Sequence, residues 1–357
     1  MKQTFLLEGK LYGADEIAPL QKQCETSEWQ KRILLSFLQW WFGNEEKKNI
    51  KTSGSTGTPK EIVITKENMK RSALASIAFF NLQAGEKVLL ALPLQFIGGM
   101  MMVVRAVLAN MDMYPVNPSL CPLLHPMPRM DFASLTPSQM TNMLETEKKE
   151  EIEKIKTVLL GGGSINDSLK QKLYSLKTQC YSSYAMTETL SHVALQKLNG
   201  NNPQKAYYPL PEVRIASSKK GTALISTPWN EKKLVTNDLI SINSDGSFHI
   251  LGRTDDAITT GGVTLLPEQL ENEWAPYLSV TFAAAAIPDI RWGEQLVLVT
   301  ESNIDFHSFL VHAQTTVSKI HLPKSHYVLL IPKTPTGKTA RKILNEQLKQ
   351  KYSLSET

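Results

Sequence analysis

The sequence has few cysteines, and its histidines are not spaced for metal binding. Its 357 residues include only Cys24, Cys121 and Cys180, together with seven histidines. Three cysteines cannot form a disulfide framework, no CxxC pair is present to bind zinc, and no HExxH motif occurs. We therefore expect a protein of a reducing compartment that lacks a structural zinc site.

Long apolar runs and concentrated charge are also missing. The most apolar stretch, residues 98–109, is interrupted by Arg105 and is shorter than the about 20 residues that cross a bilayer. The N-terminal residues are too briefly apolar for a signal peptide. The 39 Lys and Arg residues against 34 Asp and Glu give a net charge of +5, without the basic stripe of nucleic-acid binders. We expect a cytoplasmic protein with no nucleic-acid partner and no membrane insertion.

The chain length and the apolar pattern predict a layered α/β protein of two or three domains, at roughly 150 residues per domain. Short apolar segments at 87–91 and 156–160 end in Pro or Gly, as buried strands do. Helical patterns cover residues 66–80, 99–108 and 166–176. Strands that alternate with helices in this way favour an α/β architecture.

The first fifty residues are expected to form a small preface of a hairpin and a helix. The hairpin turns at Glu8 and Gly9. The helix is expected over 27–42, because Ser27 and Gln30 have the spacing of a capping box and Gly43 follows.

The chain changes its pattern near residue 209 and again near 253. Residues 209–251 contain short β-like pieces with turns at Asn230 and at 244–246, which predict an antiparallel sheet or a small β-barrel-like subdomain. A polar hinge is expected at 253–256, between an N-terminal domain (1–252) and an α+β C-terminal domain (257–357). In that domain we expect strands at 280–287 and 295–300, and helices from Pro267, over 305–319 and from Thr339.

Residues 51–60, KTSGSTGTPK, are the most informative segment. Small residues let the backbone wrap around an anion, hydroxyl groups donate hydrogen bonds, and Lys60 supplies positive charge. The spacing is not that of a Walker A loop, because Pro59 and Lys60 stand where Gly and Lys are required. A flexible linker is the alternative. The position between a strand ending at Ile50 and a strand at 62–64 favours a phosphate-binding loop.

This loop and the motifs that follow it resemble those of the acyl-adenylate-forming superfamily, which includes acyl- and aryl-CoA ligases, luciferases and adenylation domains. The matching segments are 92–99 (acid site), 160–164 (adenine side), 184–188, 236–238 (ribose), 252–255 (hinge) and 332–338 (catalytic lysine). They occur in the family's order and span residues 50 to 345. The resemblance implies a large α/β lobe, a small mobile C-terminal lobe, and the use of ATP, Mg²⁺ and CoA.

The resemblance also assigns residues to the nucleotide. The implied nucleotide-binding set is Thr52, Ser53, Gly54, Ser55, Thr56, Gly57, Lys60, Gly161, Gly162, Gly163, Tyr184, Asp238 and Arg253. Within it, the loop residues and Lys60 would hold the β- and γ-phosphates. Thr187 would contact the α-phosphate and Glu188 would position Mg²⁺. Taken alone, Glu188 is equally a solvated carboxylate, Asp238 a turn residue and Tyr184 a buried structural tyrosine.

The C-terminal motifs imply a mobile lobe that serves two reaction steps. Lys338 would act in adenylation, and the lobe would then rotate about Asp255 to allow thioester formation. Gly261 and Gly262 would form the loop on the CoA side, because glycine lets the backbone pass close to a narrow tunnel. A surface lysine and an ordinary hairpin turn are the alternatives.

The acid site is assigned to Arg105, Phe96, Gly98 and Ser182. Arg105 interrupts an apolar helix that follows the acid-site segment, and a buried guanidinium is costly without an anion. It resembles the arginine of aryl-CoA ligases whose acid carries a second carboxylate. The alternative is an arginine at the helix edge, with the apolar part of its side chain along the protein surface. Two other functions are possible alternatives for this sequence: a stand-alone adenylation protein that charges a carrier protein, and a nucleotide-binding pseudoenzyme.

The sequence departs from the family at several positions. Glu61, Ala185 and Asn237 replace usual glycines, Phe96 replaces a common histidine, and Thr259 stands where many members have lysine. Only fifty residues precede Lys51, which is short for the family. Part of the pocket wall is therefore expected to be absent or supplied by a neighbouring subunit of a homodimer.

Overall fold

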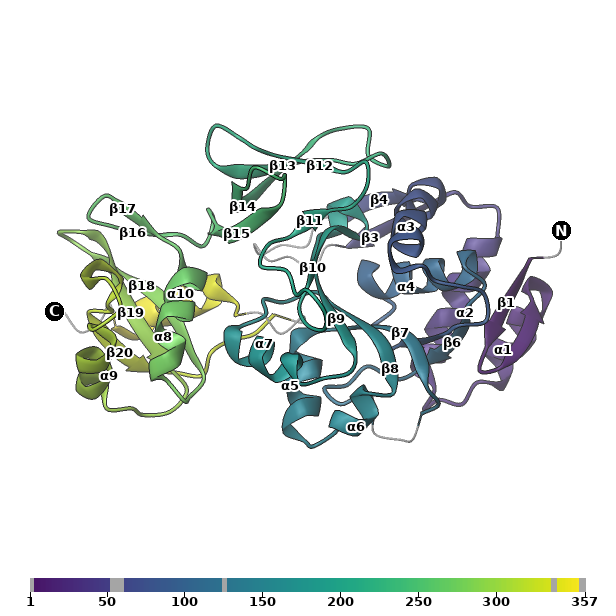
Figure 1. The fold of residues 1–357 in the computed structure, drawn as a ribbon, viewed down its shortest axis with the longest axis horizontal. Helices are drawn as coiled ribbons and strands as arrows, with labels where there is room; N and C mark the ends of the chain where they lie inside the picture. Colours follow the sequence, from purple (N-terminus) through teal and green to yellow (C-terminus); the bar gives the residue numbers. More distant parts are fainter. Residues whose placement is uncertain (1–2, 52–60, 124–126, 335–338, 353–357) are drawn as a thin grey trace.

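The computed structural model describes residues 3–51, 61–123, 127–334 and 339–352, which form four β-sheets with helices packed on them (Figure 1). The largest sheet has nine strands and lies opposite a smaller C-terminal lobe, with a four-stranded sheet beside the connection between them. Within these residues, no helix is both long and apolar enough to span a bilayer.

The nine-stranded sheet is mainly parallel. Its order is β11-β10-β9-β8-β7-β5-β6-β1-β2. Pairs are parallel from β9 to β1, and β11, β10 and β2 are antiparallel to their neighbours. The strands are β1 Thr4–Leu7, β2 Lys10–Gly13, β5 Lys87–Leu90, β6 Asp112–Pro115, β7 Met130–Leu135, β8 Ile155–Leu160, β9 Gln179–Ala185, β10 His192–Lys197 and β11 Tyr208–Pro209.

Helices cover both faces of this sheet. One layer contains α2, α3 and α4, and the other contains α5, α6 and α7 (Figure 1). Their bounds, with that of the short α1, are α1 Ile17–Gln23, α2 Trp29–Phe42, α3 Lys66–Phe80, α4 Ile97–Leu108, α5 Pro137–Glu145, α6 Lys149–Ile152 and α7 Asp167–Tyr174. The predicted layered α/β architecture is thus confirmed.

Alternation along the central strands explains the two layers. On β5, Val88 and Leu90 belong to the core beneath α2, α3 and α4, whereas Leu89 belongs to the core beneath α5, α6 and α7. The same split separates Phe132 from Ala133 on β7. Successive side chains of a strand point to opposite faces of the sheet, so a continuous apolar run contributes side chains to both cores.

The strands β1 and β2 belong to the large sheet, so the start of the described chain is not a separate preface. The predicted hairpin is confirmed: Glu8 and Gly9 have φ values of 51° and 82°, as a two-residue turn requires. The predicted capping box at Ser27 is wrong, because α2 begins at Trp29 with Glu28 as its N-cap. The Gln30 side chain is instead buried and donates to the carbonyl of Leu92 over 2.7 Å.

The predicted phosphate loop connects the two strands of a separate hairpin. β3 (Lys47–Lys51) and β4 (Glu61–Thr65) pair antiparallel, and α3 follows at once. Thr65 caps α3, since its hydroxyl accepts from the amide of Asn68 over 3.2 Å. The predicted helix at 66–80 is confirmed with the same bounds.

The region from Pro209 to the hinge contains an antiparallel sheet of four strands in the order β12-β13-β14-β15. The strands are β12 Arg214–Ser217, β13 Thr222–Ser226, β14 Leu234–Ile242 and β15 Phe248–Arg253. No pairing of β12 with β15 occurs among the described residues, so the sheet is open there. Of the two predicted forms, the antiparallel sheet is correct and the barrel-like closure is not seen.

The C-terminal lobe is a sheet between helices. The sheet has the order β17-β16-β19-β18, with β20 also paired to β19. Helices α8 and α9 cover one face and α10 covers the other. The bounds are β16 Ile258–Thr260, β17 Val263–Leu265, α8 Pro267–Trp274, β18 Phe282–Asp289, β19 Gly293–Thr300, α9 Phe306–Ala313, β20 Ser325–Val328 and α10 Arg341–Tyr352.

Candidate active site

The glycine-rich segment follows β8 at the carboxyl edge of the parallel strands. The amide of Gly161 donates to the carbonyl of Leu135 at the end of β7 over 3.0 Å. A Cβ at Gly161 would lie 2.7 Å from Oγ of Ser183 on β9, and Gly162 has a φ of +80°. Larger residues therefore do not fit at these positions. Ligands of open α/β sheets bind outside this edge, so Gly161, Gly162 and Gly163 lie where a nucleotide is expected.

Tyr184 links β9 to the four-stranded sheet. It is 6% exposed, and its hydroxyl donates to Oδ2 of Asp238 on β14 over 2.7 Å. Burial and then the nearby Asp238 charge raise the pKa of Tyr184. Its ring packs edge-on against Phe248, with ring centroids 5.5 Å apart. Two positions earlier, Ser182 is buried and shares a 2.6 Å hydrogen bond with the hydroxyl of Tyr207. The adenine-facing role of Tyr184 stays a prediction.

Thr187 and Glu188 lie on a 3-10 turn, Thr187–Thr189, directly after β9. The amide of Asn230 holds this turn, because its Nδ2 donates to the carbonyl of Glu188 over 3.0 Å. The side chain of Glu188 is exposed. The described residues contain no group of three His, Cys, Asp or Glu that could hold a metal. An exposed carboxylate fits Mg²⁺, which binds proteins through one or two carboxylates together with substrate phosphates.

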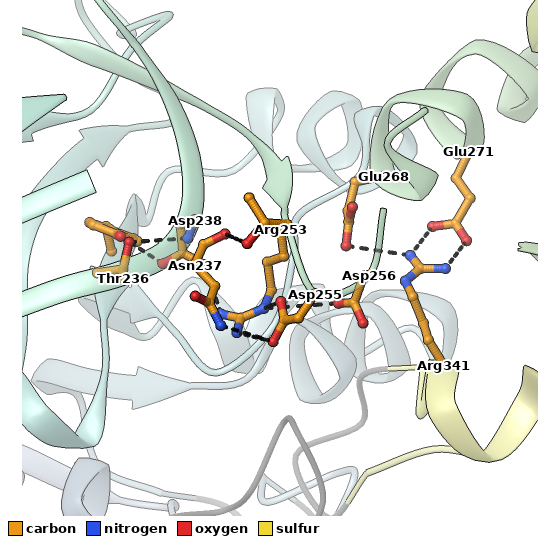
Figure 2. Close-up of polar contacts among 11 residues, drawn as sticks. Thr236, Asn237, Asp238, Arg253, Asp255, Asp256, Glu268, Glu271 and Arg341 are labelled. Atoms are coloured by element: carbon orange, nitrogen blue, oxygen red, sulfur yellow. Dashed lines mark hydrogen bonds and ion pairs between the residues drawn. The ribbon is translucent and has the colours of Figure 1, made fainter. Parts of the chain in front are cut away.

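Arg253 joins the predicted ribose-binding residue to the predicted hinge residue (Figure 2). Its Nη1 donates to Oδ1 of Asp238 over 2.8 Å. Its Nε and Nη2 form a two-point contact with Asp255 over 2.9 and 2.8 Å. Burial opposes ionisation of Asp255, but the hydrogen bond to Arg253, the charge of Arg253 and weaker hydrogen bonds together outweigh burial and lower the pKa of that carboxyl. The amide of Asn237 adds a 3.4 Å bond to Asp255. One guanidinium therefore connects β14, the end of β15 and the segment that follows it.

A second ion cluster lies in the C-terminal lobe beyond this segment (Figure 2). Arg341 on α10 makes a two-point contact with Glu271 on α8 over 2.8 and 2.9 Å, and it lies 3.5 Å from Glu268. Oε2 of Glu268 is buried and has no partner among the described residues. Burial raises the pKa of Glu268 and of the neighbouring Asp256. Sequence reasoning missed this cluster, because nothing in the helix pattern shows which glutamates face the sheet.

The predicted acid-site segment forms the start of α4. Phe96 is its N-cap residue, and both Phe96 and Gly98 are exposed. Gly99 is enclosed: a Cβ there would lie 2.5 Å from the carbonyl oxygen of Pro93. Glycine is therefore required at position 99 for the segment to turn into the helix.

Arg105 lies two turns further along α4 and is fully buried, with 2% exposure. Its Nη2 donates to Oγ of Ser191 and lies 3.5 Å from Nδ1 of His192, and its Nη1 lies 3.6 Å from the sulfur of Met102. Its Nε has no partner within the described residues. No described carboxylate contacts this guanidinium, and burial lowers its pKa to about 9. The alternative of an arginine at the helix edge is wrong. The sequence motifs gave neither Ser191 nor His192 a role in the site, although both lie shortly after the Thr187–Glu188 motif.

Gly261 and Gly262 form the turn between β16 and β17, with φ values of +57° and +80°. The amide of Gly261 donates to the carbonyl of Trp292 over 2.9 Å. A Cβ at Gly261 would lie 2.8 Å from the indole ring of Trp292. This turn therefore needs glycine for both its conformation and its contact with the segment before β19.

Several predicted site residues lie outside the described part of the chain. They are Thr52, Ser53, Gly54, Ser55, Thr56, Gly57, Lys60 and Lys338. Of the described ones, direct bonds connect Tyr184, Asp238, Arg253 and Asp255, whereas Arg105 belongs to a separate buried cluster.

The fold and these motifs define a class, and comparison with known proteins agrees. A family model described as AMP-binding enzyme matches residues 50–221. A 2-succinylbenzoate–CoA ligase of Listeria monocytogenes is 26% identical over 324 residues, which cover 83% of this chain and 69% of the relative.

Solved structures of acyl-CoA synthetases share the fold. An AMP-forming acyl-CoA synthetase/AMP-acid ligase II-like protein of Dyadobacter fermentans is 29% identical, with a TM-score of 0.61, covering 92% of this chain and 98% of that one. An O-succinylbenzoate coenzyme A synthetase of Bacillus subtilis, in complex with ATP and magnesium ion, has a TM-score of 0.72 at 22% identity, covering 82% and 68%.

The match of residues 50–221 to AMP-binding enzymes agrees with the acyl-adenylate-forming superfamily that the motifs predicted. Within it, the chain is an AMP-forming acyl-CoA synthetase.

Proposed function

We propose that this acyl-CoA synthetase is a 2-succinylbenzoate–CoA ligase of menaquinone biosynthesis. The observation that carries the proposal is the buried guanidinium of Arg105, which no described carboxylate contacts. Removing a cation from water is costly unless an anion compensates it. An acid with two carboxylates, one activated and one free, would provide that anion. The relatives named 2-succinylbenzoate–CoA ligase support this choice of acid.

The reaction would proceed in two steps. A carboxylate oxygen of the acid attacks the α-phosphorus of ATP and pyrophosphate leaves, which gives an acyl-AMP. The sulfur of CoA then attacks the acyl carbon and AMP leaves. Because two anions approach each other in the first step, positive charge is needed where they meet. Lys338 is the residue we assign to that place, as the family resemblance implies.

The nucleotide would lie at the carboxyl edge of β8 and β9. Asp238 would accept hydrogen bonds from the ribose hydroxyls, since its carboxylate oxygens retain lone pairs beyond those used by Tyr184 and Arg253. Mg²⁺, when bound at Glu188, would compensate phosphate charge. Gly161, Gly162 and Gly163 would border the adenine, and the 51–60 loop would hold the β- and γ-phosphates.

The division of the chain into a domain of residues 1–252, a hinge at 253–256 and a lid of residues 257–357 is part of this proposal. Asp255 would be the pivot, and Gly261 and Gly262 would face the CoA tunnel in the second step. Ser182, Phe96 and Gly98 would border the acid. A homodimer remains a prediction.

A pyrophosphate-release assay with a panel of acids tests the proposal. The protein is incubated with ATP, Mg²⁺, one acid and either CoA or a pantetheinylated carrier protein. We expect release with 2-succinylbenzoate and CoA. Release with other aryl acids but not with 2-succinylbenzoate would contradict the choice of acid. Acyl transfer to the carrier but not to CoA would support the stand-alone adenylation protein instead.

A further inference from the structure

The buried surroundings of Arg105 contain polar groups that the proposed reaction does not use. Ser191 and His192 come from the segment after the Thr187–Glu188 turn, and Ser72 and Ser76 come from α3. All four are buried, with exposures of 8%, 2%, 1% and 0%. Buried polar groups of this kind are retained when they hydrogen-bond to one another or to a ligand.

A chain of hydrogen bonds determines which nitrogen of His192 carries the proton. The hydroxyl of Ser76 donates to the carbonyl of Ser72 over 3.3 Å. Oγ of Ser76 lies 3.0 Å from Nε2 of His192. Because its own proton is directed at Ser72, Oγ of Ser76 accepts a hydrogen bond from the N–H group at Nε2. Nδ1 is then the acceptor nitrogen of a neutral ring.

The acceptor nitrogen faces Arg105. Nδ1 of His192 lies 3.2 Å from Oγ of Ser191 and 3.5 Å from Nη2 of Arg105, which also donates to Ser191. The opposite tautomer would place an N–H group against the guanidinium. Burial and then Arg105 lower the pKa of His192 well below its usual value, which keeps the ring neutral.

This arrangement orients a guanidinium without neutralising it. A carboxylate in place of His192 would hold Arg105 more tightly but would cancel its charge. Serine hydroxyls and a neutral imidazole accept hydrogen bonds without carrying negative charge, so the positive charge of Arg105 is left for an external anion. Its Nε, which has no described partner, still has a proton to donate.

We infer that His192 is a positioning residue that sets the acid specificity. Held by Ser76, it orients Arg105 and leaves the guanidinium charge available to the free carboxylate of the acid. The inference rests on the proposed function, because it assigns Arg105 to that carboxylate.

The test compares two acids that differ by one carboxylate. The probes are 2-succinylbenzoate and 4-oxo-4-phenylbutanoate, which lacks the ring carboxylate. For each, kcat and KM of pyrophosphate release are measured with the wild type, Arg105→Met, His192→Leu, His192→Asn and Ser76→Ala. Asn retains an acceptor near the Nδ1 position, whereas Leu has none.

We expect the wild type to prefer the dicarboxylic acid. His192→Leu should reduce this preference about tenfold by raising the KM for the dicarboxylic acid. A tenfold change is comparable to the loss of one charged hydrogen bond. The KM for ATP and for the monocarboxylic acid should stay unchanged. His192→Asn should recover most of the preference, and Ser76→Ala should lose part of it.

The outcomes separate this inference from the proposed function. If the wild type releases no pyrophosphate with 2-succinylbenzoate, the proposed function fails and the inference fails with it. If Arg105→Met abolishes the preference but His192→Leu does not, only the inference is overturned. An equal rise of both KM values in His192→Leu overturns it too, since that marks a purely structural role. If His192→Leu does not fold, an unchanged preference in Ser76→Ala is the contradicting result.

Discussion

Arg253 and Asp238 are joined by a 2.8 Å hydrogen bond between Nη1 and Oδ1, at the point where β14 pairs with the end of β15. The same guanidinium holds Asp255, two residues further along the chain. A residue assigned to the ribose and a residue assigned to the hinge thus share one cation. Whatever disturbs Arg253 should affect nucleotide binding and the orientation of the hinge together.

Replacing Arg253 with lysine should weaken ATP binding. Lysine keeps the charge but cannot make the two-point contact with Asp255 while also reaching Asp238. We expect the KM for ATP to rise about tenfold, as for a lost charged hydrogen bond. Steady-state kinetics at saturating acid measure this, and Arg214→Lys on the exposed part of β12 is the matched control. An unchanged KM for ATP in Arg253→Lys would separate Arg253 from the nucleotide site.

Replacing Gly261 with alanine should impair thioester formation more than adenylation. Gly246, in the turn between β14 and β15, is a matched control, because its φ is +82° and a Cβ there would meet nothing within 4 Å. Both variants strain the backbone by about 1–2 kcal/mol. Only Gly261→Ala also pushes against Trp292.

We expect Gly261→Ala to slow transfer from acyl-AMP to CoA by about ten- to a hundredfold, as displaced reactive groups do. Pyrophosphate release in a single turnover without CoA should be normal. Equal effects of Gly261→Ala and Gly246→Ala on the CoA step would argue against a role for this turn in thioester formation.

Replacing Arg341 with methionine should destabilise the C-terminal lobe. The Arg341 side chain is 10% exposed, and its removal leaves the carboxylates of Glu271 and Glu268 without their cation. Breaking a buried pair in this way costs about 3–5 kcal/mol. Denaturant unfolding measures the loss. The control, Arg71→Met, breaks an exposed pair with Glu67 and should cost at most about 1 kcal/mol. Similar losses in both variants would contradict the assignment.

The protein should become less stable as the pH is lowered, partly because of His192. The pKa of His192 is lowered in the folded state, so below about pH 6.5 the unfolded chain binds a proton that the folded one does not. The free energy of unfolding then decreases as the pH falls, by up to about 1.4 kcal/mol per pH unit from this group. We expect the loss between pH 7 and 5 to be smaller in His192→Asn. The same slope in both proteins would show that His192 takes up a proton as readily in the folded state as in the unfolded one, which would contradict the lowered pKa.

Local sequence signals predicted much of the fold. The helix at 66–80 and the hairpin at Glu8 and Gly9 both rest on contacts between residues a few positions apart, and both were correct. The capping box at Ser27 failed because a long-range contact decides the start of α2: Gln30 reaches the carbonyl of Leu92.

In the candidate site, too, local sequence motifs predicted some residues, whereas long-range packing determines others. The motifs indicate Asp238, Arg253 and Asp255, and the structure joins all three. By contrast, the cluster around Arg105 needs Ser191, His192 and Ser76 from other elements. No local pattern brings α3, α4 and β10 together, since their proximity results from the packing of a nine-stranded sheet. The sequence pattern therefore identified the buried cation but not its neighbours.

The most direct measurement is the identification of the products formed from 2-succinylbenzoate, ATP, Mg²⁺ and CoA. We expect 2-succinylbenzoyl-CoA, AMP and pyrophosphate in equal amounts, identified by mass spectrometry and nucleotide chromatography. Arg105→Met should form little thioester from this acid. Formation of ADP and phosphate, or no thioester from the wild-type protein, would contradict the account.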